Sequence, residues 1–529
     1  MLVALGYLSF LLHAHLPFVK HGEDQRPRRD DWLLEALVES YIPLLLSWHR
    51  LVEEQVQFRL TLSVSPTLLG MLRDPLVQER SRGHLRSLLE LAEKEVDRTQ
   101  KWPDIRALAE MYRQRIAEAQ DFFTERCGSN LVQGIHSLAQ TGSVEVITTA
   151  ATHGFLPALK ADENAVRSQV MVALDSYAEV FGDRPRGFWL PECGYYPGLD
   201  GALEAEGIRY FIVDSGGILK ARPRPKCGFH APVYMRSGVA AFARDPAASE
   251  QVWSSVIGYP GDHNYREFYR DIGYDLDYGY LAPYLPADGS RKDTGFKYYR
   301  ITGPGNEKQI YVREQALSKA GLHSGHFLEV CKQRIGDLSL QLERRPIIVA
   351  PFDAELFGHW WFEGPEWLEY LIRKIAFDQS IVALTTPSEY LDRYPVNQVV
   401  ELCPSTWGRE GFNKVWVNGA NDYIYRHLHW AARQMKTLAA EASKRRRLAY
   451  RAAQQAAREL LLAQSSDWPF MMCDSNTADY GHMRFRKHML NFLGLHRQIG
   501  SGRIERDWLN HLENADNLFP NIKLAHFSG

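Results

Sequence analysis

The residues with the clearest chemical potential lie in one stretch in the second half of the chain. Residues 345–361 read RPIIVAPFDAELFGHWW, an apolar run followed within a few positions by two carboxylates, a histidine and two tryptophans. The apolar run is typical of a strand buried on both faces, as in a parallel sheet. Because charge is rarely placed at a core edge without a partner, we expect the end of this strand, at Asp353, to open into an active site.

A second stretch also has an apolar run that ends in a carboxylate. Residues 187–195 read GFWLPECGY, a short apolar strand that ends in Glu192 beside aromatic residues. Cleavage of a glycosidic bond with retention requires two carboxyl groups about 5 to 5.5 Å apart, one as nucleophile and one as acid/base. The aromatic faces would stack on sugar rings. Asp353 must then keep a proton near neutral pH, so we expect a raised pKa for Asp353 and a low one for Glu192.

Three histidines lie directly after predicted strands: His13, His15 and His153. We expect them to form hydrogen bonds with sugar hydroxyls. The His-x-His spacing also allows a metal site completed by Asp353 or Asp214, as in a metal-dependent deacetylase or mannosidase, and such an enzyme would lose activity in chelator. No third ligand has a characteristic spacing, so we expect no metal and no cofactor.

Several aromatic and charged residues are candidates for contact with a glucan. Trp189 and Trp360 flank the two carboxylates, and glycines bracket Trp407 in residues 405–412, which is typical of an exposed loop that holds an acceptor chain. The other candidates for such contacts are Trp416, Tyr234 and Arg244.

Three polar residues are expected to support the site, namely Glu145, Asp214 and His359. For Glu145 the sequence leaves two interpretations open. It either orients a catalytic group or serves as a salt-bridge partner at a strand edge.

Strands and helices alternate along the part of the chain that carries these residues. Seven strands are predicted, near residues 5–12, 56–64, 142–149, 187–191, 209–214, 345–352 and 380–385. Helical segments lie between most of them, which predicts an α/β fold with a (β/α)7 barrel formed by residues 1–66 and 141–400.

Three regions depart from this alternation. Residues 67–140 are almost entirely helical in pattern, too long for one crossover helix, and predict an inserted helical subdomain. Residues 221–325 are rich in tyrosine, glycine and proline with little periodicity, and an irregular stretch of this length is usually functional, so we expect a lid over the strand ends. Residues 401–529 predict a C-terminal helical domain, with helices near 420–440, 442–465 and 478–500.

The composition excludes several classes of partner. Charged residues make up 24% of the 529 positions and the net charge is −2, which gives no reason to expect nucleic acid or an anionic membrane. Six cysteines without a CxxC pair argue against a zinc ribbon or a disulfide framework and fit a reducing compartment. Because histidines interrupt the apolar run near the N-terminus, we expect no signal peptide, no membrane span and a cytoplasmic protein. The 13 tryptophans and 25 tyrosines suit carbohydrate binding.

Five motifs in order give the chain a family resemblance. They are HAHLP at 13–17, GSVE at 142–145, WLPE at 189–192, FDAELFGHWW at 352–361 and TPSEY at 386–390. With them the chain resembles glycoside hydrolase family 57. Four more stretches, at 238–245, 258–261, 265–271 and 465–470, resemble its 1,4-alpha-glucan branching enzymes in particular.

The resemblance implies a retaining mechanism on a (β/α)7 barrel, with Glu192 as nucleophile and Asp353 as general acid/base. It implies a branching enzyme that acts on alpha-glucans such as amylose, amylopectin and glycogen, and it leaves the oligomeric state open. The alternatives are a 4-alpha-glucanotransferase or alpha-amylase of the same family, or a non-catalytic glucan-binding protein, although retention of both carboxylates speaks against the last. Whether a lid excludes water from the intermediate decides between transfer and hydrolysis.

Overall fold

The structure, a computed structural model, describes residues 4–19, 31–254, 257–286, 288–303, 305, 307–442 and 447–528. Its centre is one sheet of nine strands. The strands are β1 (Gly6–Ala14), β2 (Leu60–Val64), β3 (Val144–Thr149), β4 (Gly187–Trp189), β5 (Tyr210–Val213), β6 (Val233–Tyr234), β7 (Ala240–Ala243), β8 (Ile347–Asp353) and β9 (Val382–Leu384).

The sheet curls into a seven-stranded parallel barrel. Its strand order is β6-β7-β5-β4-β3-β2-β1-β8, with β9 paired to the start of β1, and the pairs are parallel except β6 with β7. The two ends of the parallel part meet where the Asp245 amide donates to the Val349 carbonyl over 2.8 Å. Every residue of β1 is buried, as expected of a parallel strand covered on both faces. The predicted α/β barrel fold is confirmed.

Seven of these strands are predicted from the sequence, but one predicted barrel position is wrong. The predicted strand at 380–385 corresponds to β9, which lies beside β1, and the sixth position in the barrel belongs to β7. This strand lies inside residues 221–325, which the sequence analysis treated as irregular throughout. Its sequence is Ala-Ala-Phe-Ala, fully buried, and small alanines carry little of the β-branched signal by which strands are recognised.

Helices cover the outside of the barrel and fill the connections. The helices between strands include α1 (Asp31–Ala36), α2 (Ile42–Glu53), α7 (Leu156–Leu159), α8 (Glu163–Phe181), α9 (Leu199–Glu204), α10 (Ser215–Leu219), α14 (Arg313–Gln341) and α15 (Gly364–Phe377), and α16 (Pro387–Arg393) follows β9. Residues 221–325 also contain α11 (Pro246–Trp253), α12 (Ile272–Asp275) and α13 (Tyr278–Leu281).

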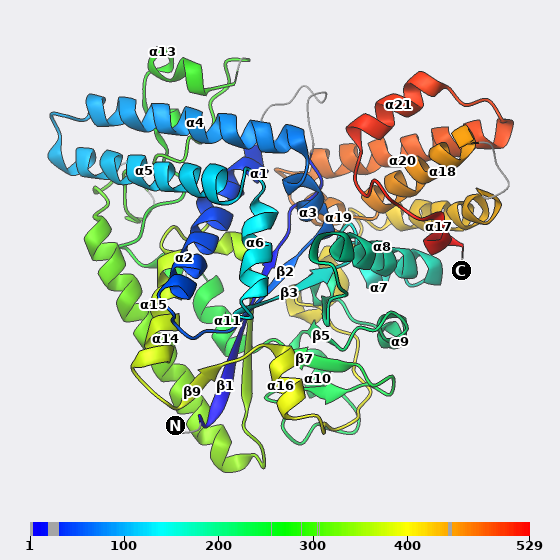
Figure 1. The fold of residues 1–529 in the computed structure, drawn as a ribbon, viewed down its shortest axis with the longest axis horizontal. Helices are drawn as coiled ribbons and strands as arrows, with labels where there is room; N and C mark the ends of the chain where they lie inside the picture. The colour runs from blue at the N-terminus through cyan, green and yellow to red at the C-terminus, as the bar shows by residue number, and fades with distance from the viewer. Residues whose placement is uncertain are drawn as a thin grey trace.

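Two groups of helices extend the barrel on opposite sides (Figure 1). Between β2 and β3 the chain forms α3 (Pro66–Leu72), α4 (Pro75–Arg98), α5 (Pro103–Asp121) and α6 (Leu131–Gln140), of which α4 and α5 run side by side. After the barrel come α17 (Tyr423–Ala442), α18 (Arg447–Ala463), α19 (Asp467–Met472), α20 (Ala478–Ser501) and α21 (Arg506–Ala515).

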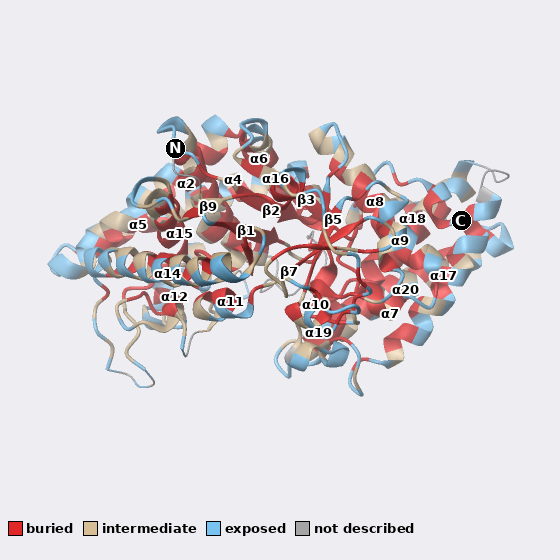
Figure 2. Ribbon diagram, turned by 90° about the horizontal axis from the view of Figure 1, so that it is seen from below, coloured by how far each residue is buried: buried red, intermediate tan, exposed pale blue. Residues whose placement is uncertain are grey.

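Burial is concentrated in the sheet and on the helix faces that pack against it, and exposed residues mark the outer faces of the helices (Figure 2). No helix within the described ranges combines the length and the apolar character needed to cross a membrane.

Candidate active site

The carboxyl ends of the strands bring the two predicted catalytic carboxylates to one rim of the barrel. Asp353 is the last residue of β8 and lies opposite His13 in the β1–β8 ladder. Glu192 follows β4 in a short turn with φ of +60°, a left-handed conformation that is unusual for a residue other than glycine. Such strained positions cluster at active sites, because the surrounding structure must hold them.

Both oxygens of Glu192 are held by donors from later parts of the chain. The indole Nε1 of Trp407 donates to Oε2, and the hydroxyl of Ser466 donates to Oε1, each over 2.9 Å. Burial raises the pKa of Glu192, and these two donors oppose the rise without cancelling it. The expectation of a low pKa for this carboxyl is therefore wrong, because burial outweighs the hydrogen bonds.

The pKa of Asp353 is raised more strongly than that of Glu192. Burial is the first cause that raises its pKa well above the ordinary value, and the negative charges of Glu355 and Glu192 raise it further. This environment favours the protonated form of the carboxyl, which suits it to general acid catalysis. The expected high pKa of Asp353 is confirmed.

Glu355, two residues after Asp353, forms hydrogen bonds with Tyr41 and His15. Its Oε1 accepts hydrogen bonds from the Tyr41 hydroxyl and, over 3.2 Å, from the backbone amide of His15. These contacts tie the loop after β8 to the end of β1. The charge of Glu355 is therefore fixed beside the proposed acid.

The three histidines lie together at this rim. The rings of His15 and His153 stack with centroids 4.0 Å apart, and His13 Nε2 lies 3.0 Å from His153 Nε2. His13 and His153 are almost fully buried, so contact with a sugar requires their mutual hydrogen bond to open. Burial lowers the pKa of both rings well below the ordinary value, which keeps them neutral.

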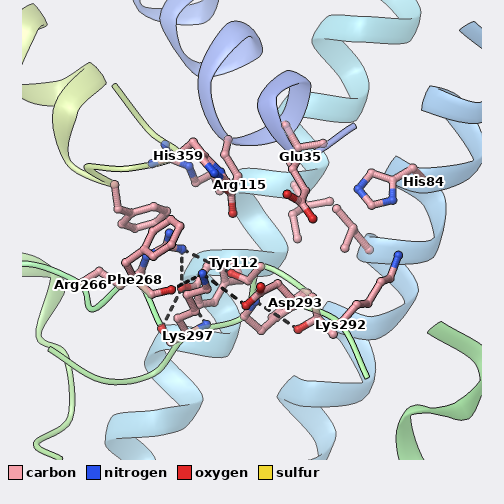
Figure 3. Close-up of a pocket in the computed structure, with 18 residues that line it drawn as sticks. Glu35, His84, Tyr112, Arg115, Arg266, Phe268, Lys292, Asp293, Lys297 and His359 are labelled. Atoms are coloured by element: carbon pink, nitrogen blue, oxygen red, sulfur yellow. Dashed lines mark hydrogen bonds and ion pairs between the residues drawn. The ribbon is translucent and has the colours of Figure 1, made fainter. Parts of the chain in front are cut away.

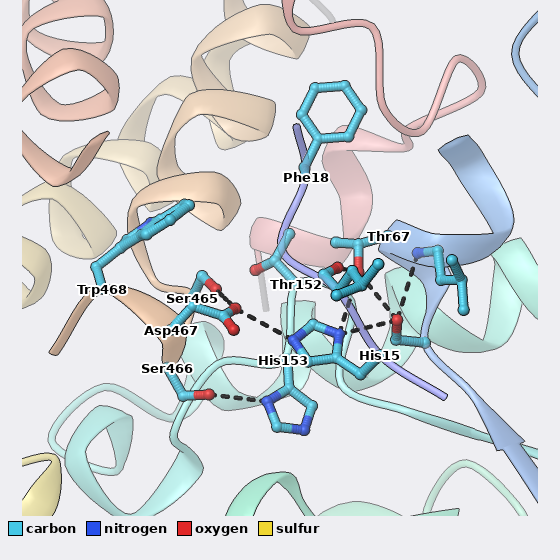
Figure 4. A network of polar contacts seen from close by, with 12 residues as sticks. His15, Phe18, Thr67, Thr152, His153, Ser465, Ser466, Asp467 and Trp468 are labelled. Carbon is cyan, nitrogen blue, oxygen red and sulfur yellow. Dashed lines mark hydrogen bonds and ion pairs between the residues drawn. The ribbon is translucent and has the colours of Figure 1, made fainter. Parts of the chain in front are cut away.

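Unlike His13 and His153, His15 pairs with a carboxylate from the C-terminal helices (Figure 4). Its Nε2 lies 3.1 Å from Asp467 Oδ2, and its Nδ1 lies 2.9 Å from the Ser65 hydroxyl. Burial lowers the pKa of His15, but the charge and hydrogen bond of Asp467, together with the charges of Glu355 and Glu192, outweigh burial and the net shift is upward. Burial likewise opposes the ionisation of Asp467, yet His15 lowers its pKa to about 2. The pair is partly buried, and the two pKa shifts favour the charged form of each partner.

Two of the four tryptophans expected to stack on sugars are core residues. Trp189 is fully buried, with its ring stacked on His13 at 4.8 Å and against the edge of Trp407. Trp416 is 2% exposed and stacks on Phe155. Neither offers a free ring face, so the prediction of stacking platforms is contradicted for both.

Two other candidates lie at the opposite, amino-terminal end of the barrel. Tyr234 pairs with the first residue of β7, and its hydroxyl donates to the Pro395 carbonyl over 3.1 Å. Glu145 is the second residue of β3 and accepts a hydrogen bond from Ser388. The structure does not bring either residue to the catalytic carboxylates, and the partner of Glu145 is the Ser388 hydroxyl rather than a cation, so its predicted salt bridge stays a prediction.

Trp407, Arg244 and Asp214 do lie at the rim. Arg244 Nη2 and Asp214 Oδ2 form an ion pair of 3.1 Å at the ends of β7 and β5, and the guanidinium lies 5.9 Å from the Trp407 ring. Asp214 also caps α10 by accepting from the Gly216 amide. These three residues remain candidates for contact with substrate.

His359 lines a neighbouring pocket between the inserted helices α4 and α5 and the segments 266–268 and 292–297 (Figure 3), and Trp360 follows it in the chain. Trp360 is 58% exposed and its ring stacks on Phe268 at 4.6 Å, so its role as a stacking platform for sugars stays a prediction. His359 lines the pocket and pairs with Glu39 over 2.5 Å. That His359 supports the catalytic carboxylates stays a prediction. The side chain of His359 itself lines this pocket.

The sequence analysis missed Ser466 and Asp467 as site residues. It noted residues 465–470 only as part of the resemblance to branching enzymes, and nothing in a helical region 113 positions after Asp353 indicates contact with the barrel rim. An antiparallel bridge between Gly154 and Ser465 brings this segment to the loop that carries His153.

Among the described residues, three side chains that lie close enough together to share a metal ion are Glu459, His488 and Asp516, in the C-terminal helices. Arg484 donates to His488 and Lys487 lies 3.7 Å from Asp516, so nearby cations already balance the carboxylates. The strand-end histidines form hydrogen bonds with serine, with carboxylate and with each other, which does not resemble a set of metal ligands.

Comparison with known proteins gives relatives along the whole chain. The family model of glycosyl hydrolase family 57 matches residues 9–403, and that of the 1,4-alpha-glucan branching enzyme C-terminal region matches residues 427–527. A 1,4-alpha-glucan branching enzyme of Thermococcus kodakarensis is 32% identical over 97% of this chain and 77% of its own length.

Two solved structures are similar over nearly their full length. The alpha-amylase AmyC of Thermotoga maritima has a TM-score of 0.93 at 38% identity, with 99% of each chain covered. A branching enzyme of the same family from Pyrococcus horikoshii has a TM-score of 0.89 at 31% identity, with 99% of this chain and 97% of that chain covered. The chain therefore belongs to glycosyl hydrolase family 57.

Proposed function

We propose that this chain is a 1,4-alpha-glucan branching enzyme that cleaves an alpha-1,4 linkage with retention and transfers the released glucan to a 6-hydroxyl. The observation that carries the proposal is the pair Glu192 and Asp353, partly buried at one rim of the barrel, with the pKa of Asp353 raised by burial and by the charges of Glu355 and Glu192. Similarity to branching enzymes, including a match to their C-terminal region, supports transfer to a glucan acceptor.

In the first step Glu192 attacks the anomeric carbon while Asp353 gives its proton to the leaving 4-oxygen. This breaks the alpha-1,4 bond and forms an ester between the glucan and Glu192. In the second step Asp353, now ionised, takes the proton of an acceptor 6-hydroxyl as its oxygen attacks the same carbon. The ester bond breaks, an alpha-1,6 branch forms, and both carboxyls return to their starting states.

Several residues at or near this rim are proposed to bind the alpha-glucan. Trp360 supplies an exposed ring, and Trp407 and Arg244 line the approach to Glu192. Residues 221–325 are proposed to limit the access of water to the ester, which favours transfer over hydrolysis. The reaction needs no cofactor, and we place it in glycogen or alpha-glucan synthesis in the cytoplasm.

Incubation with amylose tests this function when the product is assayed in two ways. One assay counts new reducing ends, and the other counts short chains released by a debranching enzyme. New branches with few reducing ends are expected. Linear chains of redistributed length would indicate 4-alpha-transfer, and no change in any alpha-glucan would overturn the proposal.

Alpha-amylase action is the second candidate, and a specific observation favours it. The Thermotoga maritima alpha-amylase is similar over 99% of both chains at 38% identity, a higher identity than that of the branching enzymes above. An amylase uses the same two carboxyls and accepts water in the second step. It would produce reducing ends without branches in the same assay.

A further inference from the structure

A chain of hydrogen bonds runs from the barrel wall to Glu192 through two buried histidines. Ser63 Oγ lies 3.0 Å from His13 Nδ1, and His13 Nε2 lies 3.0 Å from His153 Nε2. His153 Nδ1 lies 2.8 Å from Ser466 Oγ, and this hydroxyl lies 2.9 Å from Glu192 Oε1. The four side chains that precede Glu192 are each at most 3% exposed, so bulk water does not compete for these bonds.

The acceptor at the end of the chain sets the direction of every bond. An ionised carboxylate only accepts, so the single hydroxyl proton of Ser466 points to Glu192 and Ser466 must accept from His153 Nδ1. His153 then carries its proton on Nδ1, which leaves Nε2 to accept from His13 Nε2–H. His13 Nδ1 is in turn unprotonated and accepts from the hydroxyl of Ser63.

This order requires both histidines to be neutral, because a doubly protonated imidazole has no acceptor. Their environment meets the requirement. Burial lowers the pKa of His13 and of His153, and the neighbouring His15 lowers both further. Each ring is therefore held neutral and, by its two partners, in a single tautomer.

We propose that Ser466 is a positioning residue for Glu192, acting as the last link of the relay Ser63–His13–His153–Ser466–Glu192. The role of Glu192 as nucleophile rests on the proposed function, whereas the two tautomers do not depend on it. The backbone fixes the serine in place, since the Ser466 amide donates to the His153 carbonyl over 3.0 Å. With Trp407 on the other oxygen, the carboxylate is held in one orientation.

The proton affinity of Glu192 depends on Ser466 and on the charges around it. The titratable groups that face Glu192 are His15 after β1, His153 after β3, Asp353 on β8 and Asp467 on α19. The Ser466 hydroxyl lowers the pKa of Glu192. Its removal raises that pKa, so the carboxyl takes up a proton at higher pH.

Kinetics of three variants test the positioning role on amylose. Ser466→Ala is expected to lower kcat about tenfold, because a hydrogen bond to a charged group is lost, and to move the acid limb of the kcat/KM profile to higher pH. Ser466→Thr keeps the hydroxyl and is expected to restore both quantities. Ser81→Ala, a buried serine in α4 that donates to Val77 O over 2.8 Å, is the matched control and leaves both unchanged.

The tautomers give a readout that needs no activity. In protein labelled with ¹⁵N-histidine, the ring shifts should show His153 protonated at Nδ1 and His13 at Nε2, with assignments from His13→Gln and His153→Gln. Ser466→Ala should release His153 into exchange between tautomers. A His153 protonated at Nε2 in the unaltered protein, or an acid limb that Ser466→Ala leaves in place, would overturn the relay. Correct tautomers without any action on amylose would overturn the proposed function alone.

Discussion

At the scale of single residues, the proposed acid is tuned by a neighbour that need not touch the substrate. Glu355 accepts hydrogen bonds from Tyr41 and His15. Burial is the largest cause that raises the pKa of Asp353, and the negative charge of Glu355 is the next. Glutamine in its place can accept the same two bonds. The substitution Glu355→Gln therefore isolates the effect of the charge.

We expect Glu355→Gln to move the basic limb of the kcat/KM profile to lower pH. That limb marks the loss of the Asp353 proton, and removal of a nearby negative charge lowers the pKa at which it leaves. Glu145→Gln, which removes a buried carboxylate at the other end of the barrel, serves as the control. A limb that stays in place in Glu355→Gln would show that the charge of Glu355 does not contribute to this pKa.

The two carboxyls themselves are tested by isosteric amides. Glu192→Gln removes the nucleophile and Asp353→Asn the acid/base, so each is expected to lower branching on the order of 10³-fold, within the range ascribed to such groups. Initial rates on amylose give the comparison, with thermal midpoints to establish that both variants are folded. Substantial residual activity in either variant contradicts the assignment.

These carboxyls were predictable because each follows an apolar run that reads as a strand, and parallel strands present their carboxyl ends at a common rim. Ser466 and Asp467 were not. A serine and an aspartate at the start of a helix have the pattern of an ordinary N-terminus. Only the tertiary bridge from Gly154 to Ser465 carries them to Glu192.

At the scale of elements, tertiary contacts also determine which strands can be predicted from sequence. Seven of the nine strands were predicted from sequence. The two-residue β6 was missed, and β7 was missed because burial and pairing with β5, rather than composition, define it. The ends of helices depend more on residues that are close together in the sequence. Thr386 and Glu389 form a reciprocal capping box at the start of α16, as the spacing of these residue types permits.

We expect Thr386→Ala to destabilise the protein by about 1 kcal/mol, because the first turn of α16 loses its capping acceptor. The urea midpoint, compared with that of the unaltered protein, gives the measurement. Thr437→Ala, at an exposed position within α17, is the control and should shift it far less. An equal shift in both variants would mean that the cap contributes nothing beyond ordinary helix propensity.

At the scale of the whole molecule, the partly buried pair of His15 and Asp467 joins the C-terminal helices to the barrel. The pKa of His15 is raised, so its contribution to stability is full below its unfolded pKa and is lost as pH rises through the folded value. Asp467 has its pKa lowered to about 2, so its contribution is full above its unfolded pKa and is lost as pH falls toward that value. Stability from the pair is therefore greatest in mildly acidic solution.

We expect Asp467→Asn to lower the unfolding free energy by about 2 kcal/mol near pH 6, the cost of a hydrogen bond to a charged group, and by less near pH 9. Denaturant melts at both pH values check this. Asp479→Asn, on the first turn of α20, is the control and should show no such pH dependence. An equal loss at both pH values would show that the charge of His15 does not contribute.

The position of Ser466 in the chain also has a consequence for synthesis. The ribosome completes β8, with Asp353, 113 residues before it reaches Ser466. At about 5 to 20 residues per second this interval lasts roughly 6 to 23 seconds. During that time a nascent barrel contains both carboxyls, but Glu192 lacks its serine donor and His15 lacks its aspartate. The growing polypeptide thus acquires a complete catalytic centre only after most of its length has been translated.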